Sequence, residues 1–530
     1  MKRKSKLYLR MTILLLVIYL FLLTVLCLSE YTDSHATIRS FGDAFWYSLV
    51  TLTTVGYGDL TPVTPLGQAV GVIFLLLSAG IMMTLFGAVI SFVTSEGLPL
   101  FLLSRQRKKN WYYFADCSVE SRTLAANIYK EDADTVIIFG EKRDDQTEFP
   151  DYPCLFINVS PARIVEHKKG VGSKCRIFLM QENDIGSNPR AIDLHSLPVD
   201  VYARTTNGRD HLSGNINFFH SYDCCARQYW HSKPLCSYEN TIVILGFGNY
   251  GRCILERAIM TNIISVSQHV AYHIFGDARQ FLSMHNHLHE TFSLNSVSAT
   301  ADSLIFHDDL WEMHHALMEL ADRIIICPDN EPEGWNIYWR LNSYYKLNGQ
   351  IHLHSNRKTP GVTYFGANEE IYTPDQIMRT ALNKAAITIN EIFCRSVSYP
   401  TRTWDELDDF HRDSKISAAD HLLMKIRILL NDETITELTP EITQRASKVY
   451  RETRKAPDIQ EMYRRIDHTR WLRFYTFYNW SYGPARNDIA RRHPMLCPYD
   501  QLNPEQKRER DAAWELLESI APELLRDIRS

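Results

Sequence analysis

Residues Phe41–Asp59 read FGDAFWYSLVTLTTVGYGD, and this stretch decides the fold of the N-terminal part of the chain. Its first part, Phe41–Leu52, is aromatic and amphipathic, which predicts a short helix. Its second part places Gly56 and Gly58 at alternate positions. Glycine adopts positive φ at little steric cost, so a loop with alternate glycines can turn successive carbonyl oxygens toward one axis. The stretch therefore predicts a short helix that leads into a loop lined by backbone oxygens.

Two long apolar runs flank this stretch. Met11–Leu28 and Gly67–Val93 contain no charged residue, and about 20 such residues in a helix cross a hydrocarbon core of about 30 Å. The first run lacks the small-residue cleavage site of a signal peptide and is followed by the second, so we expect both to remain as membrane helices. Basic residues before the first run and after the second place both termini in the cytoplasm. These residues are Lys2, Arg3, Lys4, Lys6, Arg10, Arg105, Arg107, Lys108 and Lys109.

The helix, the loop and the two runs together resemble the pore of the potassium-channel family, whose filter reads TVGYG. The resemblance implies that filter carbonyls, with the Thr54 hydroxyl, replace the water around a K⁺ ion. It also implies that Tyr57 braces the filter and that Asp59 lies at the outer mouth. Two membrane helices do not enclose a pore alone, so it implies a homotetramer in the lipid bilayer of the cell membrane. The filter residues are Thr54, Val55, Gly56, Tyr57, Gly58 and Asp59, and the carbonyls that bind K⁺ are those of Thr54, Val55, Gly56 and Tyr57.

Two glycines in the second apolar run, Gly80 and Gly87, are candidates for the hinge at which this helix bends during gating. Close packing of helices through small residues explains each of them equally well. The sequence leaves this choice open.

Beyond residue 105, predicted strands alternate with predicted helices, which is typical of doubly wound α/β domains. The clearest unit begins at Asn240, where the strand Thr241–Leu245 is followed by GFGNYG at residues 246–251. The three glycines of such a turn permit its tight bend, the approach of a phosphate and close helix packing, and an acid after the next strand can bond a ribose. The sequence predicts a nucleotide or dinucleotide site here, whereas glycines that only shape the fold are the alternative. The candidate residues are Gly246, Gly248, Gly251 and Asp277.

An earlier lobe of the same type lacks the glycine fingerprint. Asp116–Ser121 follows its first strand, and Gly140-Glu141 follows its second. We therefore expect a structural role or an altered ligand in this lobe. The strands predicted in it are Trp111–Phe114, Thr135–Phe139, Cys154–Asn158, Cys175–Met180 and Val199–Ala203; those predicted in the later lobe, after Thr241–Leu245, are Val270–Phe275, Ser303–Phe306, Asp322–Cys327 and Gln350–His354.

A pore followed by two such lobes resembles the RCK (regulator of K⁺ conductance) architecture of potassium channels. The segment Ile371–Phe393 is similar to the helical connection after the Rossmann core in that family. The resemblance implies a cytoplasmic ring of eight lobes, in which a ligand that prefers one packing of the lobes acts on the second membrane helix. A membrane-tethered NAD-dependent oxidoreductase is the enzymatic alternative. We disfavour it because a pore precedes the lobes and no substrate domain follows them, so no enzyme activity is expected.

Beyond Thr401 the chain is predicted to be helical, and it contains two distinctive motifs, WSYGPAR at residues 480–486 and HPMLCPYDQL at residues 493–502. Ile459–Leu525 resembles the RyR domain, a small helical repeat found in ryanodine receptors and in bacterial proteins. Aromatic faces beside arginines suit a nucleotide, whereas the alternative is that the aromatics fill the core of a small helical domain. The candidate ligand-binding residues are His468, Arg470, Trp471, Trp480, Tyr482, Arg486 and Tyr499.

Overall composition excludes several classes of protein. The net charge is −5 with 22% charged residues, so both signs are plentiful and no nucleic-acid partner is expected. The eleven cysteines are scattered without a CxxC pair, which indicates reduced cytosolic thiols. Several histidines invite a metal site, but no cysteine or clear carboxylate completes any group, so we interpret them as surface or strand residues, with a cation site as the lesser alternative. They are His285, His287, His289, His314, His315, His352 and His354.

The predicted protein is thus multi-domain: an α-helical transmembrane K⁺-channel pore, two α/β Rossmann-like (RCK) lobes and a C-terminal all-α RyR-like domain. We expect a ligand-gated potassium channel that senses a nucleotide-type ligand, either in the RyR-like domain or in the second lobe. Its role is control of K⁺ or, as the alternative, defence by collapse of the membrane potential. The predicted domains are residues 1–105 for the pore, 106–238 for the first lobe, 239–398 for the second lobe and 399–530 for the RyR-like domain.

Overall fold

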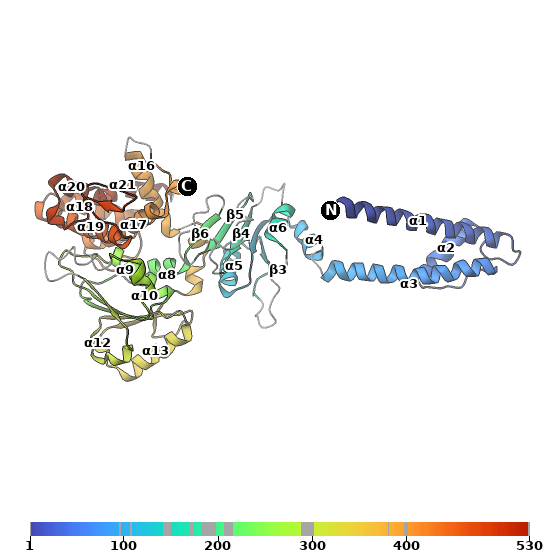
Figure 1. The fold of residues 1–530 in the computed structure, drawn as a ribbon, viewed down its shortest axis with the longest axis horizontal. Coiled ribbons are helices and arrows are strands. Elements are labelled where there is room, and N and C mark those ends of the chain that lie inside the picture. The colour runs from blue at the N-terminus through green and yellow to red at the C-terminus, as the bar shows by residue number, and fades with distance from the viewer. Residues whose placement is uncertain are drawn as a thin grey trace. The chain divides into compact units, whose positions relative to one another are not determined.

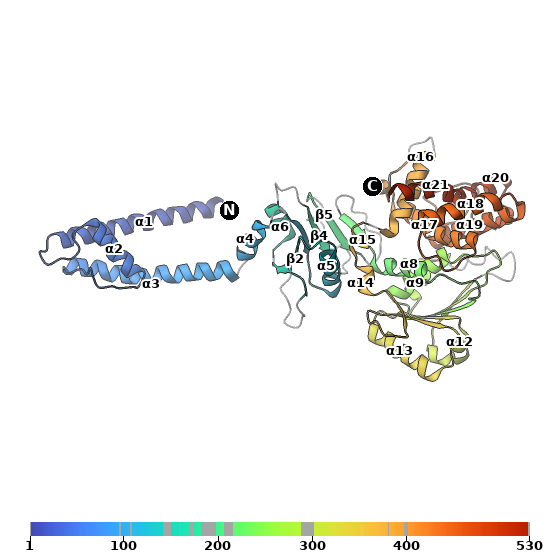
Figure 2. The same ribbon diagram turned by 180° about the vertical axis from the view of Figure 1, so that it is seen from behind.

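The computed structural model describes residues 2–94, 97–106, 109–140, 150–157, 159–168, 174–181, 198–205, 216–287, 302–379, 381–396 and 401–527. The chain divides into two compact units, Met1–Gln106 and Arg107–Ser530. Figures 1 and 2 label the helices and strands of both units from opposite sides.

The first unit is helical. Its short helix α2 packs between the long helices α1 and α3 (Figure 1), and its bounds are those that the aromatic stretch predicts. A small apolar cluster that includes Leu23, Leu26, Ala44 and Phe74 holds these three helices together. None of the helices in the described part of the chain combines the length and the hydropathy that a membrane span needs. The helices are α1 (Lys2–Tyr31), α2 (Phe41–Leu52), α3 (Pro65–Thr94) and α4 (Gly97–Arg105).

The second unit contains two six-stranded sheets in which every strand pair is parallel. The first has the order β3-β2-β1-β4-β5-β6, and the second has β12-β11-β10-β7-β8-β9. Counted from the first strand of each lobe, both orders are the doubly wound order 3-2-1-4-5-6, which confirms the predicted Rossmann-like fold of both lobes. The strands of the first sheet are β1 (Asn110–Phe114), β2 (Thr135–Phe139), β3 (Cys154–Phe156), β4 (Cys175–Leu179), β5 (Asp200–Arg204) and β6 (Ile216–Phe219).

The second sheet lies between helices. In Figure 1, α12 and α13 cover its lower face, and α8, α9 and α10 lie above it. Two edge strands, β6 in the first sheet and β12 in the second, are not predicted from the sequence because they are short. The strands of the second sheet are β7 (Thr241–Leu245), β8 (Ala271–Phe275), β9 (Ser303–His307), β10 (Arg323–Ile326), β11 (Gln350–His354) and β12 (Thr363–Phe365).

Helices surround both sheets and continue into the C-terminal part. Ile371–Phe393, the predicted helical connection, contains short helices and most of α16. The helices before residue 400 are α5 (Val119–Glu131), α6 (Pro161–Lys168), α8 (Ser221–Ser232), α9 (Asn249–Thr261), α10 (Arg279–Met284), α12 (His315–Leu320), α13 (Glu331–Tyr344), α14 (Asn368–Ile371), α15 (Pro374–Ile377) and α16 (Lys384–Ser396).

The C-terminal module, defined here as residues 401–527, is mainly helical and packs on the second lobe. Helices α17 and α19 contact α9, and Leu472, Phe474 and Trp480 share one apolar cluster with Ile254 and Ala258 of α9. The second lobe and the module therefore have a continuous core. The module's elements are α17 (Asp409–Leu430), α18 (Pro440–Thr453), α19 (Pro457–Phe477), β13 (Ser481–Tyr482), β14 (Arg492–His493), α20 (Pro504–Glu509) and α21 (Ala512–Asp527).

Candidate functional sites

The loop after α2 has alternating backbone conformations. Thr54, Gly56 and Gly58 have φ values of 59°, 60° and 73°. No atom lies within 4 Å of a Cβ built on Gly56 or Gly58, so the backbone conformation, and not lack of space, selects glycine there. Thr54 extends the alternation to a β-branched residue, for which positive φ costs about 1–3 kcal/mol. The sequence does not predict this third position because threonine rarely adopts it.

The helix before this loop is fixed at its start. The Ser40 hydroxyl accepts a hydrogen bond from the Asp43 backbone N–H (3.1 Å), and the Asp43 carboxylate accepts one from the Ser40 N–H (2.8 Å). This capping box satisfies donors that an α-helix leaves unpaired at its N-terminus. The C-terminal end of α2, with its partial negative charge, leads directly into the loop.

Trp46 of α2 ties the helix to the far end of the loop. Its Nε1–H donates a hydrogen bond of 2.9 Å to the Asp59 carboxylate, and this bond lowers the pKa of Asp59. The Trp46 ring is parallel to the Tyr57 ring, at 6.3 Å between centroids. Tyr57 and Asp59 thus both contact the helix that precedes them.

Glu30, which the sequence analysis missed, joins the end of α1 to the start of α3. Its buried carboxylate accepts hydrogen bonds from the backbone N–H groups of Val63 and Thr64 (2.9 Å each) and from the Thr64 hydroxyl (2.6 Å). A Cβ on Gly67 would overlap this carboxylate. The signal in the sequence that could have indicated this role is that Glu30 is a lone acid just after the first apolar run.

The two candidate hinge glycines stay predictions. The surroundings of Gly80 lie outside the described residues. Gly87 has no atom within 4 Å of its Cβ position in the described part of this unit, so no described side chain selects glycine there.

The glycine turn of the second lobe is tightly packed. Gly246 has φ 97°, and a Cβ on it would lie 2.6 Å from the Pro328 nitrogen. A Cβ on Gly251 would overlap the carbonyl oxygen of Gly246, and a Cβ on Gly248 would overlap the Asp329 carboxylate. Packing alone therefore explains why these three positions are glycine.

The position predicted for a phosphate is filled by the chain's own carboxylate. Asp329, which follows β10, accepts hydrogen bonds from the backbone N–H groups of Asn249 (3.1 Å) and Tyr250 (3.4 Å) at the start of α9. Asp277, the predicted ribose ligand, accepts from Arg279 Nε (2.9 Å), and the side-chain hydrogen bond from Arg279 lowers its pKa. Asp329 is not predicted from the sequence because it lies far from the glycines along the chain.

In the first lobe, residues of the turn itself form the hydrogen bonds at the start of the corresponding helix, α5. Ser118 caps α5 and accepts from the Ser121 N–H. The buried Asp116 accepts hydrogen bonds from the Ser118 N–H (3.0 Å) and the Ser121 hydroxyl (2.6 Å). The acid predicted after the second strand, Glu141, lies outside the described residues.

In the C-terminal module, three predicted ligand residues belong to the interior. His468 Nε2–H donates a hydrogen bond of 2.9 Å to the Cys497 carbonyl, and burial lowers the pKa of His468 to about 4. The Tyr499 hydroxyl donates to Glu461 (2.8 Å). Arg470 is only 6% exposed, although arginine is mostly found at protein surfaces.

Arg470 is buried because it shares one carboxylate with other cations. Asp467 lies 3.1 Å from Lys425, 3.5 Å from Arg470 and 3.9 Å from Arg510. Burial raises the pKa of Asp467, but Lys425 and then Arg470 outweigh that effect and hold it below its ordinary value. Arg470 therefore belongs to a buried ion network and does not lie at the surface of the module.

Three of the other four candidates lie at or near the surface. Tyr482 is 61% exposed, and Arg486 is half-exposed and pairs with Asp488 (2.8 Å). Trp471 is half-buried, with Arg510 4.9 Å from its ring, whereas Trp480 is buried and stacks on Phe410 at 5.3 Å. Trp471, Tyr482 and Arg486 therefore remain as candidates for contact with a ligand.

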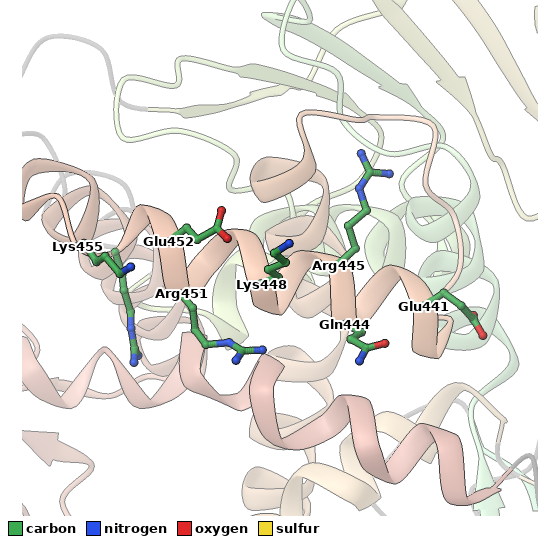
Figure 3. A pocket seen from close by; sticks show the side chains of 8 residues that line it. Glu441, Gln444, Arg445, Lys448, Arg451, Glu452 and Lys455 are labelled. Carbon is green, nitrogen blue, oxygen red and sulfur yellow. The ribbon is translucent and has the colours of Figure 1, made fainter.

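A broad cavity of about 960 Å³ lies along α18. Its side chains project from successive turns, with Arg445 and Glu452 on one side of the helix and Gln444 and Arg451 on the other (Figure 3). Arg454, which also lines it, lies 3.0 Å from Glu515. Because these charges do not converge on one point, we interpret this surface as solvated.

The sequence indicates no clear carboxylate partner for the candidate histidines, and this prediction is wrong for one of them. His314 lies beside Asp309, with 2.9 Å between its Nε2 and each carboxylate oxygen. The others have structural contacts: His285 with the Phe477 carbonyl (2.8 Å) and His352 with the Tyr229 hydroxyl (2.7 Å). His289 lies outside the described residues.

Comparison with known proteins assigns two regions to families. Residues 11–95 match the family described as ion channel, and residues 452–522 match the RyR domain. Ion channels are transport proteins and not enzymes, which agrees with the expectation for this region.

The curated relatives cover only part of the chain. A voltage-gated potassium channel of Aeropyrum pernix is 43% identical over 60 residues, which are 11% of this chain and 20% of the relative. The calcium-gated potassium channel TvoK of Thermoplasma volcanium is 24% identical over 122 residues, 23% of this chain and 35% of the relative. The chain thus spans between a fifth and about a third of the length of these relatives.

Solved structures of the GsuK channel are also similar to the chain. The structure bound to ADP has a TM-score of 0.37 and 13% identity, and the match covers 68% of this chain and 96% of that one. The structure bound to NAD has a TM-score of 0.38 and 11% identity, with coverage of 72% and 85%. The chain thus combines a region that matches the ion-channel family, two lobes whose observed strand order is Rossmann-like, and a region that matches the RyR domain.

Proposed function

We propose that this protein is a K⁺-selective channel of the cell membrane, in which four copies surround one pore and both termini face the cytoplasm. The observation that carries the proposal is the alternation of positive φ at Thr54, Gly56 and Gly58, on a loop whose sequence is that of a K⁺ filter. The potassium channels among its relatives support the same ion. In each copy, the carbonyls of residues 54–57 coordinate dehydrated K⁺.

Ion flux in liposomes tests this proposal. Reconstituted full-length protein should carry K⁺ in strong preference to Na⁺. Gly56→Ala should abolish this flux, because alanine at φ 60° carries a steric cost that glycine does not. Gly42→Ala is the matched control, since Gly42 lies in α2 with only an ordinary contact at its Cβ position. Equal flux of Na⁺ and K⁺, or full K⁺ flux in Gly56→Ala, would refute the proposal.

We further propose that a nucleotide-type ligand gates the pore from the C-terminal module. Trp471, Tyr482 and Arg486 supply an aromatic face and a guanidinium at its surface, which is the chemistry that binds a phosphorylated base. The second lobe is the less favoured sensor, because Asp329 already occupies the N-terminus of α9 and a carboxylate there opposes an anion.

Titration of ADP and NAD against the reconstituted channel tests the sensor. If the module senses the ligand, Arg486→Ala should weaken the response about tenfold or more, the loss of one charge-assisted contact. Arg508→Ala, at an exposed arginine of α20, is the control. A response that Arg486→Ala leaves unchanged and Gly248→Val removes would assign sensing to the second lobe. Either outcome leaves the test of K⁺ selectivity unaffected.

A further inference from the structure

One strand end in the second lobe gathers three metal-binding side chains. β9 ends at His307, Asp309 follows two residues later, and one 3₁₀ turn at Trp311–Met313 carries the chain to His314. The hydrogen bond from the His314 N–H to the Trp311 carbonyl (3.0 Å) closes this turn. It returns His314 to Asp309 and so completes a group that is scattered along the sequence.

The distances within this group suit a small cation. His314 Nε2 lies 2.9 Å from both Asp309 oxygens, and His307 Nδ1 lies 3.9 Å from Oδ1. One donor atom from each of the three residues lies within 4.8 Å of the other two. Bonds of about 2.0–2.1 Å in a tetrahedral site place its ligands about 3.3 Å apart. The observed separations bracket this value, so small side-chain rotations would bring the donors around one ion.

A fourth histidine orients the group from behind. His273 of β8 shares a 2.9 Å hydrogen bond with His307, from Nδ1 of His273 to Nε2 of His307. When His307 donates this bond, its Nδ1 presents a lone pair toward Asp309. The His307 ring also stacks on Phe275 at 4.2 Å, which holds its plane. Metal-binding histidines are commonly fixed in this way by a partner on their other nitrogen.

The group is also open to solvent. Asp309 is half-exposed, with 48% of its side chain accessible, so an ion can enter from solvent and keep a water ligand.

We propose that His307, Asp309 and His314 bind one divalent transition-metal ion of the Zn²⁺ type, with His273 as the residue that positions His307. Two imidazole nitrogens and one carboxylate oxygen suit Zn²⁺, Co²⁺ or Ni²⁺. Ca²⁺ and Mg²⁺ prefer sites made of oxygen atoms. The site lies at the same edge of the sheet as the glycine turn, two strands away from it, and differs from it in chemistry.

This site lies at one end of a strand whose other end meets the C-terminal module. Asp302 immediately precedes β9 and accepts a hydrogen bond of 2.8 Å from Arg473 of α19, in a buried ion pair. Four residues of β9, Ser303–Phe306, separate this pair from His307. Binding of the metal should therefore slow amide hydrogen exchange along β9.

Co²⁺ titration of the full-length protein in detergent tests the proposal. The protein is purified without a polyhistidine tag and stripped with EDTA. Visible absorption bands of four-coordinate Co²⁺ should saturate at one ion per chain and disappear on addition of Zn²⁺. Asp309→Asn and His314→Gln should each weaken binding at least 100-fold, and His273→Gln should weaken it about 10- to 100-fold. His315→Gln is the control, since His315 is the next residue but lies outside the group.

Three results would overturn the proposal. They are equal Co²⁺ binding in His314→Gln, equal loss in His315→Gln, or displacement of Co²⁺ by equimolar Ca²⁺. Zn²⁺ X-ray absorption on the unaltered protein covers the case in which a variant fails to fold. It should show imidazole and oxygen ligands, and sulfur ligands would count against the assignment.

Discussion

The two lobes have the same strand order but differ in which residues bond to the N-terminus of the helix after their first strand. The first lobe uses residues of the turn itself, with Asp116 and Ser121 joined by a hydrogen bond. The second lobe uses a glycine turn and fills it with Asp329 from a distant strand end. In both cases the protein supplies its own negative charge where a Rossmann fold can hold a phosphate. The glycine fingerprint therefore reports close packing here, and it does not by itself report a ligand.

The lobes also differ in which part of the chain packs on them, since the C-terminal module packs on the second lobe. The substitution with the largest expected effect tests this difference. Asp420 of the module is buried beside Arg227 (2.8 Å) and Arg257 (3.8 Å). Asp420→Ala leaves Arg227 without its carboxylate partner, whereas Arg257 keeps Asp223, and the substitution should cost about 3–5 kcal/mol in stability. Segment-resolved hydrogen exchange should show faster exchange in α9. The first-lobe control is Asp200→Ala, whose exposed pair with Arg176 (3.8 Å) should cost under about 1 kcal/mol. Equal effects of the two substitutions would contradict this asymmetry.

The turns themselves give the second prediction. Gly251→Ala should destabilise the second lobe by about 3 kcal/mol, because its Cβ would overlap a backbone oxygen that cannot rotate away. At the matching place in the first lobe, Ser121→Ala removes the hydrogen bond donated to Asp116 and the one accepted from the Ser118 hydroxyl, and it should cost about 1–2 kcal/mol. Denaturant titration of both variants measures the difference. A smaller loss for Gly251→Ala than for Ser121→Ala would contradict it.

Acid should affect the second lobe and the module before the first lobe. Burial lowers the pKa of His352 and of His421 to about 3. Below pH 6.5 the unfolded chain takes up protons at these histidines while the folded chain does not, so the stability present above pH 6.5 falls as the pH drops. Each contributes a loss of about 1.4 kcal/mol at pH 5.5. Hydrogen exchange at pH 7.5 and pH 5.5 tests this, after correction for the intrinsic exchange rate. Equal losses in β1 and α9 would refute it.

The smallest expected effect concerns nucleotide binding. Asp329→Asn removes the charge at the start of α9, so ADP should bind the second lobe about three- to tenfold more tightly. Glu331→Gln is the control, because Glu331 lies two residues away and bonds to Ser355 (2.6 Å) and not to α9. Asp116→Asn should leave ADP binding unchanged, since the first lobe lacks the glycine turn. Calorimetric titration with ADP measures all three. An unchanged affinity of Asp329→Asn for ADP would show that this carboxylate does not oppose nucleotide binding at the glycine turn.

The sequence predicts local features well and distant contacts poorly. The bounds of α2, the strands β2, β7 and β11 and the doubly wound class follow from periodicity and glycine positions within short segments. Asp329 and Glu30 act on residues far from them along the chain, and no local pattern indicates such a pairing. The filter loop is an intermediate case, because its glycines are readable but the positive φ of Thr54 is not.

Predictions of candidate site residues fail for a related reason, because the type of a residue does not determine whether it is buried. Arg470 suits a phosphate by its chemistry, yet it is buried beside Asp467. The neighbouring Arg486 is half-exposed. His314 lacks a visible partner in sequence, because only the turn at Trp311–Met313 brings it to Asp309. Knowledge of which side chains meet across turns and helices separates these cases.

The core that α9 shares with Leu472 and Phe474 affects how the protein is made. During synthesis the second lobe leaves the ribosome well before α19, and the apolar side of α9 then lacks its final cover. That side is a target for chaperones until the last part of the chain arrives, because exposed apolar surface in partly folded chains promotes aggregation. Deletion of the RyR homology region should therefore expose the apolar side of α9 and make the second lobe prone to aggregation.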